Sequence, residues 1–354
     1  MSDRRTTLQR LFGIELPIVQ APMAGAQGSA LTIAVSNAGG LGSLPSGLLA
    51  PDALRAELTT IRAQTDKPYN VNFFCHAVPE ADASREAAWR ATLAPYFAEL
   101  GVDESAIATG PGRWPFGDEA ADVVDEFRPA VVSFHFGLPS EALLSRVRRC
   151  GALIIASATT VDEARWLEAR GVDAVIAQGI EAGGHRGSFL SGDLSLQVGT
   201  FALVPQIVDA VSVPVIAAGG IADARGVAAA LALGAAGVQV GTAYLLCPEA
   251  TTSPVHRGAL ASDAARVTAL TNVFTGRPAR GIVNRLMREL GPMSDGAPAF
   301  PLAGSAIAPL RARAEREGSG DFSPLWAGQN TSGCTPISAA MLTRQLAAAL
   351  PPAH

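Results

Sequence analysis

Short apolar runs recur along the first 242 residues, and most are followed by a segment whose apolar residues fall on one face of a helix. The runs are rich in valine, isoleucine and alanine, as is typical of strands that are buried on both faces of a parallel sheet. The alternation of strand and helix indicates an α/β protein built from repeated βα units. Eight strands are predicted within residues 16–25, 40–47, 69–74, 129–137, 152–159, 173–179, 213–221 and 236–242.

Capping residues mark the ends of several predicted helices. Thr160 or Asp162 can cap the helix after the fifth strand, and Gly171 suits its carboxyl end. Asp223 and Gly234 mark the start and end of the helix after the seventh strand in the same way. These residues place each helix between two successive strands.

Eight strands joined by helices fit either a closed barrel or an open doubly wound sheet, since both are series of right-handed βαβ units. The count of eight favours the barrel, and no GxGxxG motif follows the first strand to support a dinucleotide-binding sheet. We therefore predict a (β/α)8 TIM barrel over residues 1–248, with an inserted helical segment at about 77–128. Residues 249–335 break the alternation and are expected to form a cap, and a helix within 336–354 is expected to pack back on the barrel.

The composition is that of an ordinary globular protein. The chain has 354 residues, of which 48% are hydrophobic and 17% charged, so it can bury a large core. The net charge of -5 is spread without a long basic tract, which argues against nucleic acid or an anionic membrane as the main partner and favours a small molecule. No apolar segment reaches the roughly 18 residues of a membrane span, so a cytoplasmic location is expected.

The cysteines and histidines show no metal-binding spacing. The four cysteines lack a CxxC pair and the five histidines lack an HExxH pattern, so neither a metal site nor a disulfide framework is predicted. No motif sets the oligomeric state, and a homodimer is left open.

The stretch QGIEAGGHRGSF, residues 178–189, starts where the predicted sixth strand ends. It combines an amide at Gln178, two glycines that let the backbone approach a ligand, and an imidazole at His185. A histidine has an ordinary pKa of about 6.5, so His185 can take a proton from a carbon acid near neutral pH. A loop histidine bonded to backbone is the alternative, but a position at the catalytic face of a barrel favours the base. His135, at the end of the fourth strand, can also reach this pocket or serve as a core histidine.

The loops after strands seven and eight carry a pattern suited to phosphate. In TIM barrels these two loops often bind phosphate through backbone N–H groups. Gly219 and Gly220 follow strand seven, and QVGT at residues 239–242 ends strand eight. Such glycines also suit tight turns, but two glycine-bearing loops and the hydroxyl of Thr242 favour phosphate.

Two side-chain amides narrow the ligand to a flavin. Asn70 after strand three and Gln178 after strand six each present a donor and an acceptor, which match the mixed edge of a flavin pyrimidine ring. Each amide taken alone suits a backbone-bonding role equally well. Together with the phosphate loops they indicate FMN.

Several motifs together suggest a family. They are PIVQAPMAG, GGLGSLPSG, YNVNFF, SFHFG, QGIEAGGHRGSF, PVIAAGGI, QVGTAYL and LWAGQ, from about residue 17 to residue 329. This set resembles the nitronate monooxygenases, formerly called 2-nitropropane dioxygenases. AAGGI recurs in many FMN barrels, whereas EAGGHRG combined with SFHFG is more specific to this group.

The resemblance implies an FMN-dependent barrel that oxidises alkyl nitronates, such as propionate 3-nitronate, with O2 to a carbonyl compound and nitrite. It implies His185 as the catalytic base, which is needed most when a neutral nitroalkane must first lose a proton. The cofactor contacts that it implies, together with the glycines of the phosphate loops, are Met23, Asn70, Gln178, Gly183, Gly219, Gly220, Gln239, Val240, Gly241 and Thr242.

Three alternative functions stay open at this point. A flavin-dependent enoyl-acyl-carrier-protein reductase has similar AAGGI and GGH regions and takes hydride from NAD(P)H. NAD(P)H:quinone reductases are also related, and one sequence does not separate either class from the monooxygenases. The third alternative is a barrel that binds FMN or another phosphate ligand without turnover, and His185 argues against it.

Overall fold

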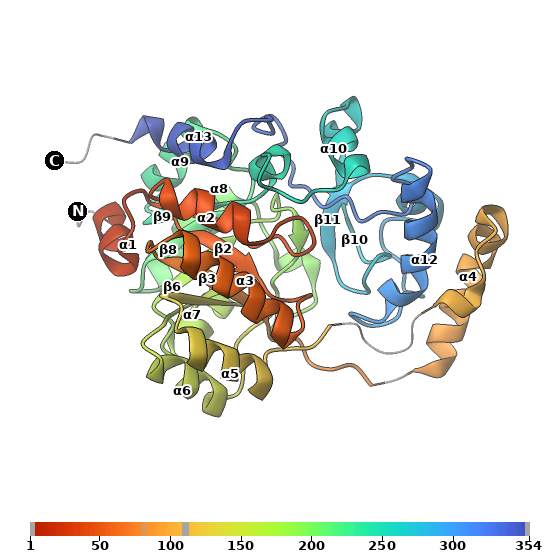
Figure 1. Cartoon of the computed structure of the whole chain (residues 1–354), viewed down its shortest axis with the longest axis horizontal. Helices are drawn as coiled ribbons and strands as arrows, with labels where there is room; N and C mark the ends of the chain where they lie inside the picture. The colour runs from red at the N-terminus through yellow and green to blue at the C-terminus, as the bar shows by residue number, and fades with distance from the viewer. Residues whose placement is uncertain (1–3, 81, 108–112, 351–354) are drawn as a thin grey trace.

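The computed structural model describes residues 4–80, 82–107 and 113–350, and eight parallel strands form a barrel on the left of the view in Figure 1. The strands follow one another in the order β1, β9, β8, β6, β5, β4, β3 and β2, and a parallel bridge between Val19 and Leu41 joins β1 to β2. All eight lie where the sequence predicts them, which confirms the TIM barrel. The strands are β1 (Ile18–Gln20), β2 (Gly42–Pro45), β3 (Tyr69–Phe74), β4 (Val131–His135), β5 (Leu153–Ala158), β6 (Ala174–Gln178), β8 (Val215–Ala218) and β9 (Gly237–Val240).

Helices between the strands form the outer layer of the barrel. They are α2 (Ser29–Asn37), α3 (Pro51–Gln64), α5 (Asp118–Phe127), α6 (Glu141–Arg149), α7 (Val161–Glu168), α8 (Thr200–Ala210) and α9 (Ala224–Ala232). Near the end of the chain, α13 (Ala339–Leu346) packs against α2 and α9, and the short η5 (Ala347–Ala349) continues it against α9 (Figure 1). Of the two candidate caps of α7, Thr160 is the one used, because its Oγ1 accepts a hydrogen bond from the Glu163 amide at 3.2 Å.

The amino-terminal end of the barrel is closed by a helix that the sequence analysis does not predict, α1 (Arg4–Phe12). Leu8 and Phe12 are buried there among the inward-facing residues at the starts of the strands, such as Val131 and Ala174. The nine-residue segment is mostly polar, so it carries no strong amphipathic pattern. With this end filled, only the carboxyl ends of the strands are left to form a site.

A cap follows the last barrel strand. Its sheet contains the antiparallel pair β10 (Thr268–Thr271) and β11 (Ala279–Ile282), and β11 also pairs with β7 (Gly184–His185) from the loop after β6. The cap helices are α10 (Pro254–Leu260), α11 (Arg285–Leu290) and α12 (Ala303–Arg316). Besides η5, the described 3-10 helices are η1 (Glu104–Ala106), η2 (Leu194–Leu196), η3 (Thr242–Leu246) and η4 (Asp263–Arg266).

The inserted segment packs on the cap through α4 (Ala83–Leu100), which lies beyond α12 from the barrel (Figure 1). Trp89, Leu93 and Phe97 of α4 are buried in one cluster with Ile307 and Leu310 of α12. Burial of these large side chains on α12 favours the association of the two helices. The insertion therefore helps to build a second hydrophobic core.

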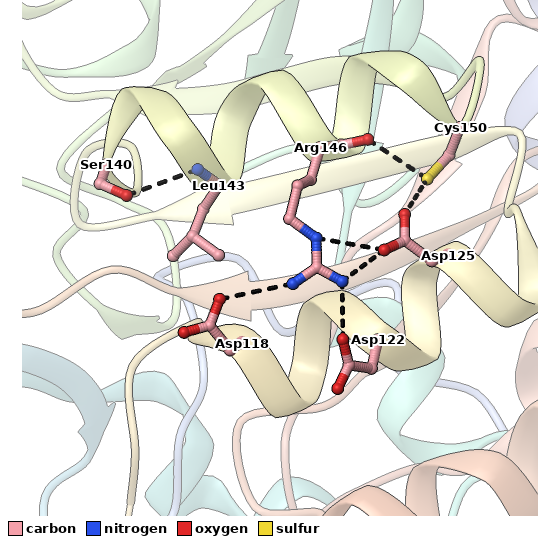
Figure 2. Close-up of polar contacts among 7 residues, drawn as sticks. All are labelled: Asp118, Asp122, Asp125, Ser140, Leu143, Arg146 and Cys150. Carbon is pink, nitrogen blue, oxygen red and sulfur yellow. Dashed lines mark hydrogen bonds and ion pairs between the residues drawn. The ribbon is translucent and has the colours of Figure 1, made fainter.

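Helices α5 and α6 are joined by a cluster of charges around Arg146 (Figure 2). Its guanidinium lies 2.6 Å from Asp122, 3.4 Å from Asp118 and 3.1 Å from Asp125, all on α5. The Cys150 thiol donates to the same Asp125 carboxylate at 2.8 Å, which with Arg146 holds the pKa of Asp125 below its usual range. The three carboxylates are exposed, so added salt should weaken their ion pairs with Arg146.

Within the described ranges, no helix is long and apolar enough to cross a bilayer. The same ranges contain no group of three or more histidine, cysteine or acidic side chains arranged to hold a metal ion. All four cysteines are free thiols.

Candidate active site

A cavity of about 250 Å³ lies at the carboxyl ends of the barrel strands and is bounded by both the barrel and the cap. Most residues that the sequence analysis assigns to a site lie around it. The predicted residues that line the cavity are Met23, His135, Gln178, Gly183, His185, Gly219, Gly220, Gln239, Gly241 and Thr242.

Two predicted contacts, Asn70 and Val240, do not line this cavity. Asn70 lies inside β3 rather than after it, fully buried, with its Nδ2 donating to the hydroxyls of Ser43 at 3.0 Å and Ser133 at 2.9 Å. Asn72 shares this face of the strand two residues nearer the carboxyl end, and it lines the cavity. Val240 points outward into the core between strands and helices. Asn72 is therefore the β3 amide that lines the cavity, while Asn70 Oδ1 is buried without a hydrogen-bond partner among the described residues. The side chain of Val240 faces away from the cavity.

His185 is held in a strand, although the sequence analysis assigns it to a loop. In β7 its backbone pairs with Ala279 of β11, which brings its side chain under the cap. Its Nε2 lies 2.9 Å from Thr275 Oγ1, and its ring centroid lies 5.2 Å from that of Phe300 and 5.4 Å from that of Trp326. The imidazole is therefore fixed between a hydroxyl and two aromatic rings.

The surroundings of His185 keep it neutral. Burial disfavours the imidazolium and lowers the pKa of His185 well below its usual value, and Arg113, His135, Arg277 and His76 lower it further. At pH 7 the ring therefore has one nitrogen with a lone pair, which is the form that can accept a proton.

Two polar side chains form hydrogen bonds with the backbone carbonyl of His185. Its carbonyl accepts hydrogen bonds from Gln178 Nε2 at 3.0 Å and from His135 Nε2 at 3.2 Å. Because a carbonyl only accepts, His135 carries its proton on Nε2, and Nδ1 then accepts from the Ser157 hydroxyl at 3.0 Å. Burial lowers the pKa of His135 to about 3, so this tautomer persists at neutral pH. Gln178 and His135 thus fix the position of His185, and His135 itself lines the cavity.

The residues after His185 are also fixed. The buried Glu163 accepts from the amides of Phe189 at 2.6 Å and Leu190 at 3.2 Å. The fully buried Arg186 donates to the Gln178 and Gly179 carbonyls, both at 2.7 Å. Hydrogen bonds on both sides of the histidine therefore limit its movement.

The side of the cavity that is lined by the ends of β8 and β9 has features that suit a phosphate-bearing cofactor. Gly219 and Gly220 have φ of 118° and 71°, which side-chain-bearing residues rarely adopt. Gln239 Oε1 is buried and has no hydrogen-bond partner in the described part of the chain. An orphaned acceptor facing a cavity is satisfied by a ligand that donates a hydrogen bond. The residues on this side therefore fit FMN.

Several cavity residues escaped the sequence analysis. From the cap and the inserted segment come Arg113, Thr252, His256, Arg311 and Trp326. Trp326 belongs to LWAGQ, a motif noted without a role, and the neighbouring Gly328 donates its amide to Thr242 Oγ1 at 2.9 Å. Asn72 could have been found from the two-residue period of β3, but the other residues have no local pattern that marks them.

The closed barrel of eight parallel strands places the chain in the (β/α)8 class, and its cavity lies at the carboxyl ends of the strands, where proteins of this class carry their active sites. The family model described as nitronate monooxygenase matches residues 5–349. A nitronate monooxygenase of Pseudomonas aeruginosa is 44% identical over 349 residues, which cover 98% of each chain. The chain therefore belongs to the nitronate monooxygenase family and is an oxidoreductase.

Solved structures agree with this assignment. Nitroalkane oxidase from Streptomyces ansochromogenes is similar with a TM-score of 0.88 and 40% identity, covering 97% of both chains. FabK from Thermotoga maritima is more distant, with a TM-score of 0.70 and 29% identity, covering 97% of this chain and 95% of FabK.

The lowered histidine pKa values give a testable prediction. Between pH 8 and pH 5 the ring resonances of His135 should keep the chemical shifts of neutral imidazole, because its folded pKa is about 3. The ring of His185 should still be neutral at pH 6.5, because burial lowers its pKa well below this value. In the unfolded chain both protonate near pH 6.5, so each contributes stability above about pH 6.5 that is lost as the pH falls. NMR of histidine-labelled protein measures this, and His185→Asn identifies the signal. A His185 resonance with a midpoint near 6.5 would contradict the prediction.

Proposed function

We propose that this protein oxidises alkyl nitronates, such as propionate 3-nitronate, with O2 to a carbonyl compound and nitrite, using FMN bound at the carboxyl end of the barrel. The observation that carries the proposal is a neutral, hydrogen-bonded His185 in the same cavity as the glycine loops and the unpartnered Gln239. Membership of the nitronate monooxygenase family supports it.

The cofactor, when bound, supplies the acceptor for electrons from the nitronate and their transfer to O2. The chain supplies its binding site. Backbone N–H groups of the two glycine loops would bind the phosphate, and the Gln239 carbonyl oxygen would accept a hydrogen bond from the flavin ring. The residues that would hold the cofactor are Met23, Asn72, Gln178, Gly183, Gly219, Gly220, Gln239, Gly241 and Thr242.

His185 is the proposed base for substrates that enter as neutral nitroalkanes. The Thr275 hydroxyl lies 3.4 Å from the Arg277 carbonyl, to which it can donate. It then accepts from Nε2–H of His185 at 2.9 Å, which leaves the lone pair on Nδ1 for the substrate. Nδ1 would remove the proton from the carbon next to the nitro group. A preformed nitronate needs no such step.

An anaerobic absorbance titration of the purified protein tests the proposed function. A bound flavin should be reduced by a nitronate and reoxidised by air with release of nitrite. Absence of a flavin spectrum would remove the cofactor assignment. If NADPH or NADH reduces the bound flavin rapidly and the nitronate does not, the protein would instead be assigned as an NAD(P)H-dependent reductase.

We expect His185→Asn to lower kcat/KM for neutral nitroalkanes by about 100-fold or more, since general-base catalysis contributes at least this much. For preformed nitronates the loss should stay within a few-fold. Both substrates are assayed by nitrite release at the same pH. Equal losses on the two would remove His185 from the role of base.

Thr275→Val should lower turnover of neutral nitroalkanes by about 10-fold, because Nε2–H loses its acceptor and the Nδ1–H tautomer gains population. Thr275→Ser keeps the hydroxyl and should restore most of the rate. Turnover of preformed nitronates and the pH profile of the serine variant serve as controls. If valine and serine behave alike, the hydroxyl does not set the tautomer.

A further inference from the structure

Two arginines face the cavity, and none of its described lining residues is a carboxylate. Arg113 comes from the segment after β3, and Arg311 comes from α12 of the cap. The Arg113 guanidinium lies 5.5 Å from the Phe300 ring centroid, and His185 contacts the same ring at 5.2 Å between centroids. The positively charged Arg113 and the proposed base His185 thus contact the same ring, that of Phe300.

The cofactor phosphate does not account for this charge. The Phe300 ring lies 6.4 Å from Phe74 at the end of β3 and 5.5 Å from Phe136 just after β4. In the strand order, β3 and β4 stand across the barrel from β8 and β9, which carry the glycine loops. Arg113 is therefore on the side of the cavity where His185 lies.

Among the described residues no carboxylate forms an ion pair with Arg113, whereas Arg311 donates from Nε to Glu315 at 2.8 Å. Glu315 also accepts from Ser323 at 2.7 Å, so its negative charge is shared. Burial and the nearby Arg311 lower the pKa of Arg113 to about 10, so it stays charged at neutral pH. The pair Arg113 and Arg311 therefore carries a net positive charge that an anionic ligand would neutralise.

A further unpartnered group lies on the cap side of the cavity. Thr252 Oγ1 is buried, with the residue 6% exposed, and has no hydrogen-bond partner in the described part of the chain. A buried hydroxyl without a partner costs stability unless a ligand bonds to it. The cap side thus offers a hydroxyl donor as well as charge to a ligand.

We propose that Arg113 and Arg311 select nitronates that carry a second negative charge, with Arg113 facing the nitronate group beside His185 and Arg311 facing a carboxylate at the other end of the substrate. This inference rests on the proposed nitronate oxidation. Guanidinium groups bind carboxylates through paired, charge-assisted hydrogen bonds, so each end of a short dianion can take one arginine. An unsubstituted alkyl nitronate has no carboxylate for Arg311 and would bind to Arg113 alone.

The test compares two nitronates of equal length, propionate 3-nitronate and the nitronate of 1-nitropropane. Arg311→Gln should lower the ratio of their kcat/KM values by about 10- to 100-fold, as expected for a lost charged hydrogen bond. Arg311→Lys should recover part of this ratio. Arg113→Gln should lower kcat/KM for both nitronates.

The matched control is Arg313→Gln on the same helix. Arg313 also forms an ion pair with the residue four positions later, Glu317, at 2.7 Å, but it does not line the cavity. Its kcat/KM ratio should stay within about twofold of the wild type. An unaltered ratio in Arg311→Gln, or an equal loss in Arg313→Gln, would overturn the proposal.

Binding of succinate to the holoenzyme separates this inference from the proposed function. Succinate is a short dianion that is not oxidised by this reaction, and calorimetry should find it bound at least about 10-fold more weakly to Arg311→Gln than to wild type. If binding depends on Arg311 but neither nitronate is oxidised, the proposed function fails and the anion site stands. If both nitronates are oxidised and succinate binds equally well to wild type and to Arg311→Gln, the proposed anion site is refuted.

Discussion

A short antiparallel pairing between the barrel and the cap is the contact on which the active site depends. Gly184 and His185 of β7 pair with Arg280 and Ala279 of β11, so a barrel loop becomes part of the cap sheet. The next amide, of Arg186, continues the contact to the Pro278 carbonyl at 2.8 Å. Because backbone pairing fixes the direction of each side chain, it brings the imidazole to Thr275 and the aromatic rings of the cap. The cap therefore contributes to the burial that lowers the pKa of His185.

The second constraint is the uneven effect of burial on the cationic groups around the cavity. A histidine loses its charge when desolvated, since its ordinary pKa lies close to neutrality. An arginine keeps its charge under the same conditions, because its ordinary pKa is far above 7. His185 and His135 are accordingly neutral, while Arg113 remains a cation. One cavity can therefore hold both a proton acceptor and a binding charge for an anion.

The barrel itself was predictable because its information is local. Buried parallel strands are short apolar runs, and caps such as Thr160 mark the helices between them. The same topology places the strand ends together, so the order of strands and helices along the chain was enough to bring His185, Gln178 and the glycine loops to one cavity. Asn70 was expected after the third strand but lies inside β3, and the sequence did not single out Asn72, which shares its face and lies nearer the carboxyl end. The polar helix α1 was missed for lack of an apolar pattern.

The sequence by itself determined the eight strands, the position of the histidine after β6 and the glycines that suit a phosphate, since each depends on residues within one βα unit. Only the tertiary structure decided what surrounds that histidine. Thr275, Phe300 and Arg113 come from segments far from it in the chain, and the pairing and packing that bring them together leave no periodic pattern. The hydrophobic effect that drives this packing is non-directional, so a sequence pattern specifies which faces are buried but not which distant side chains meet.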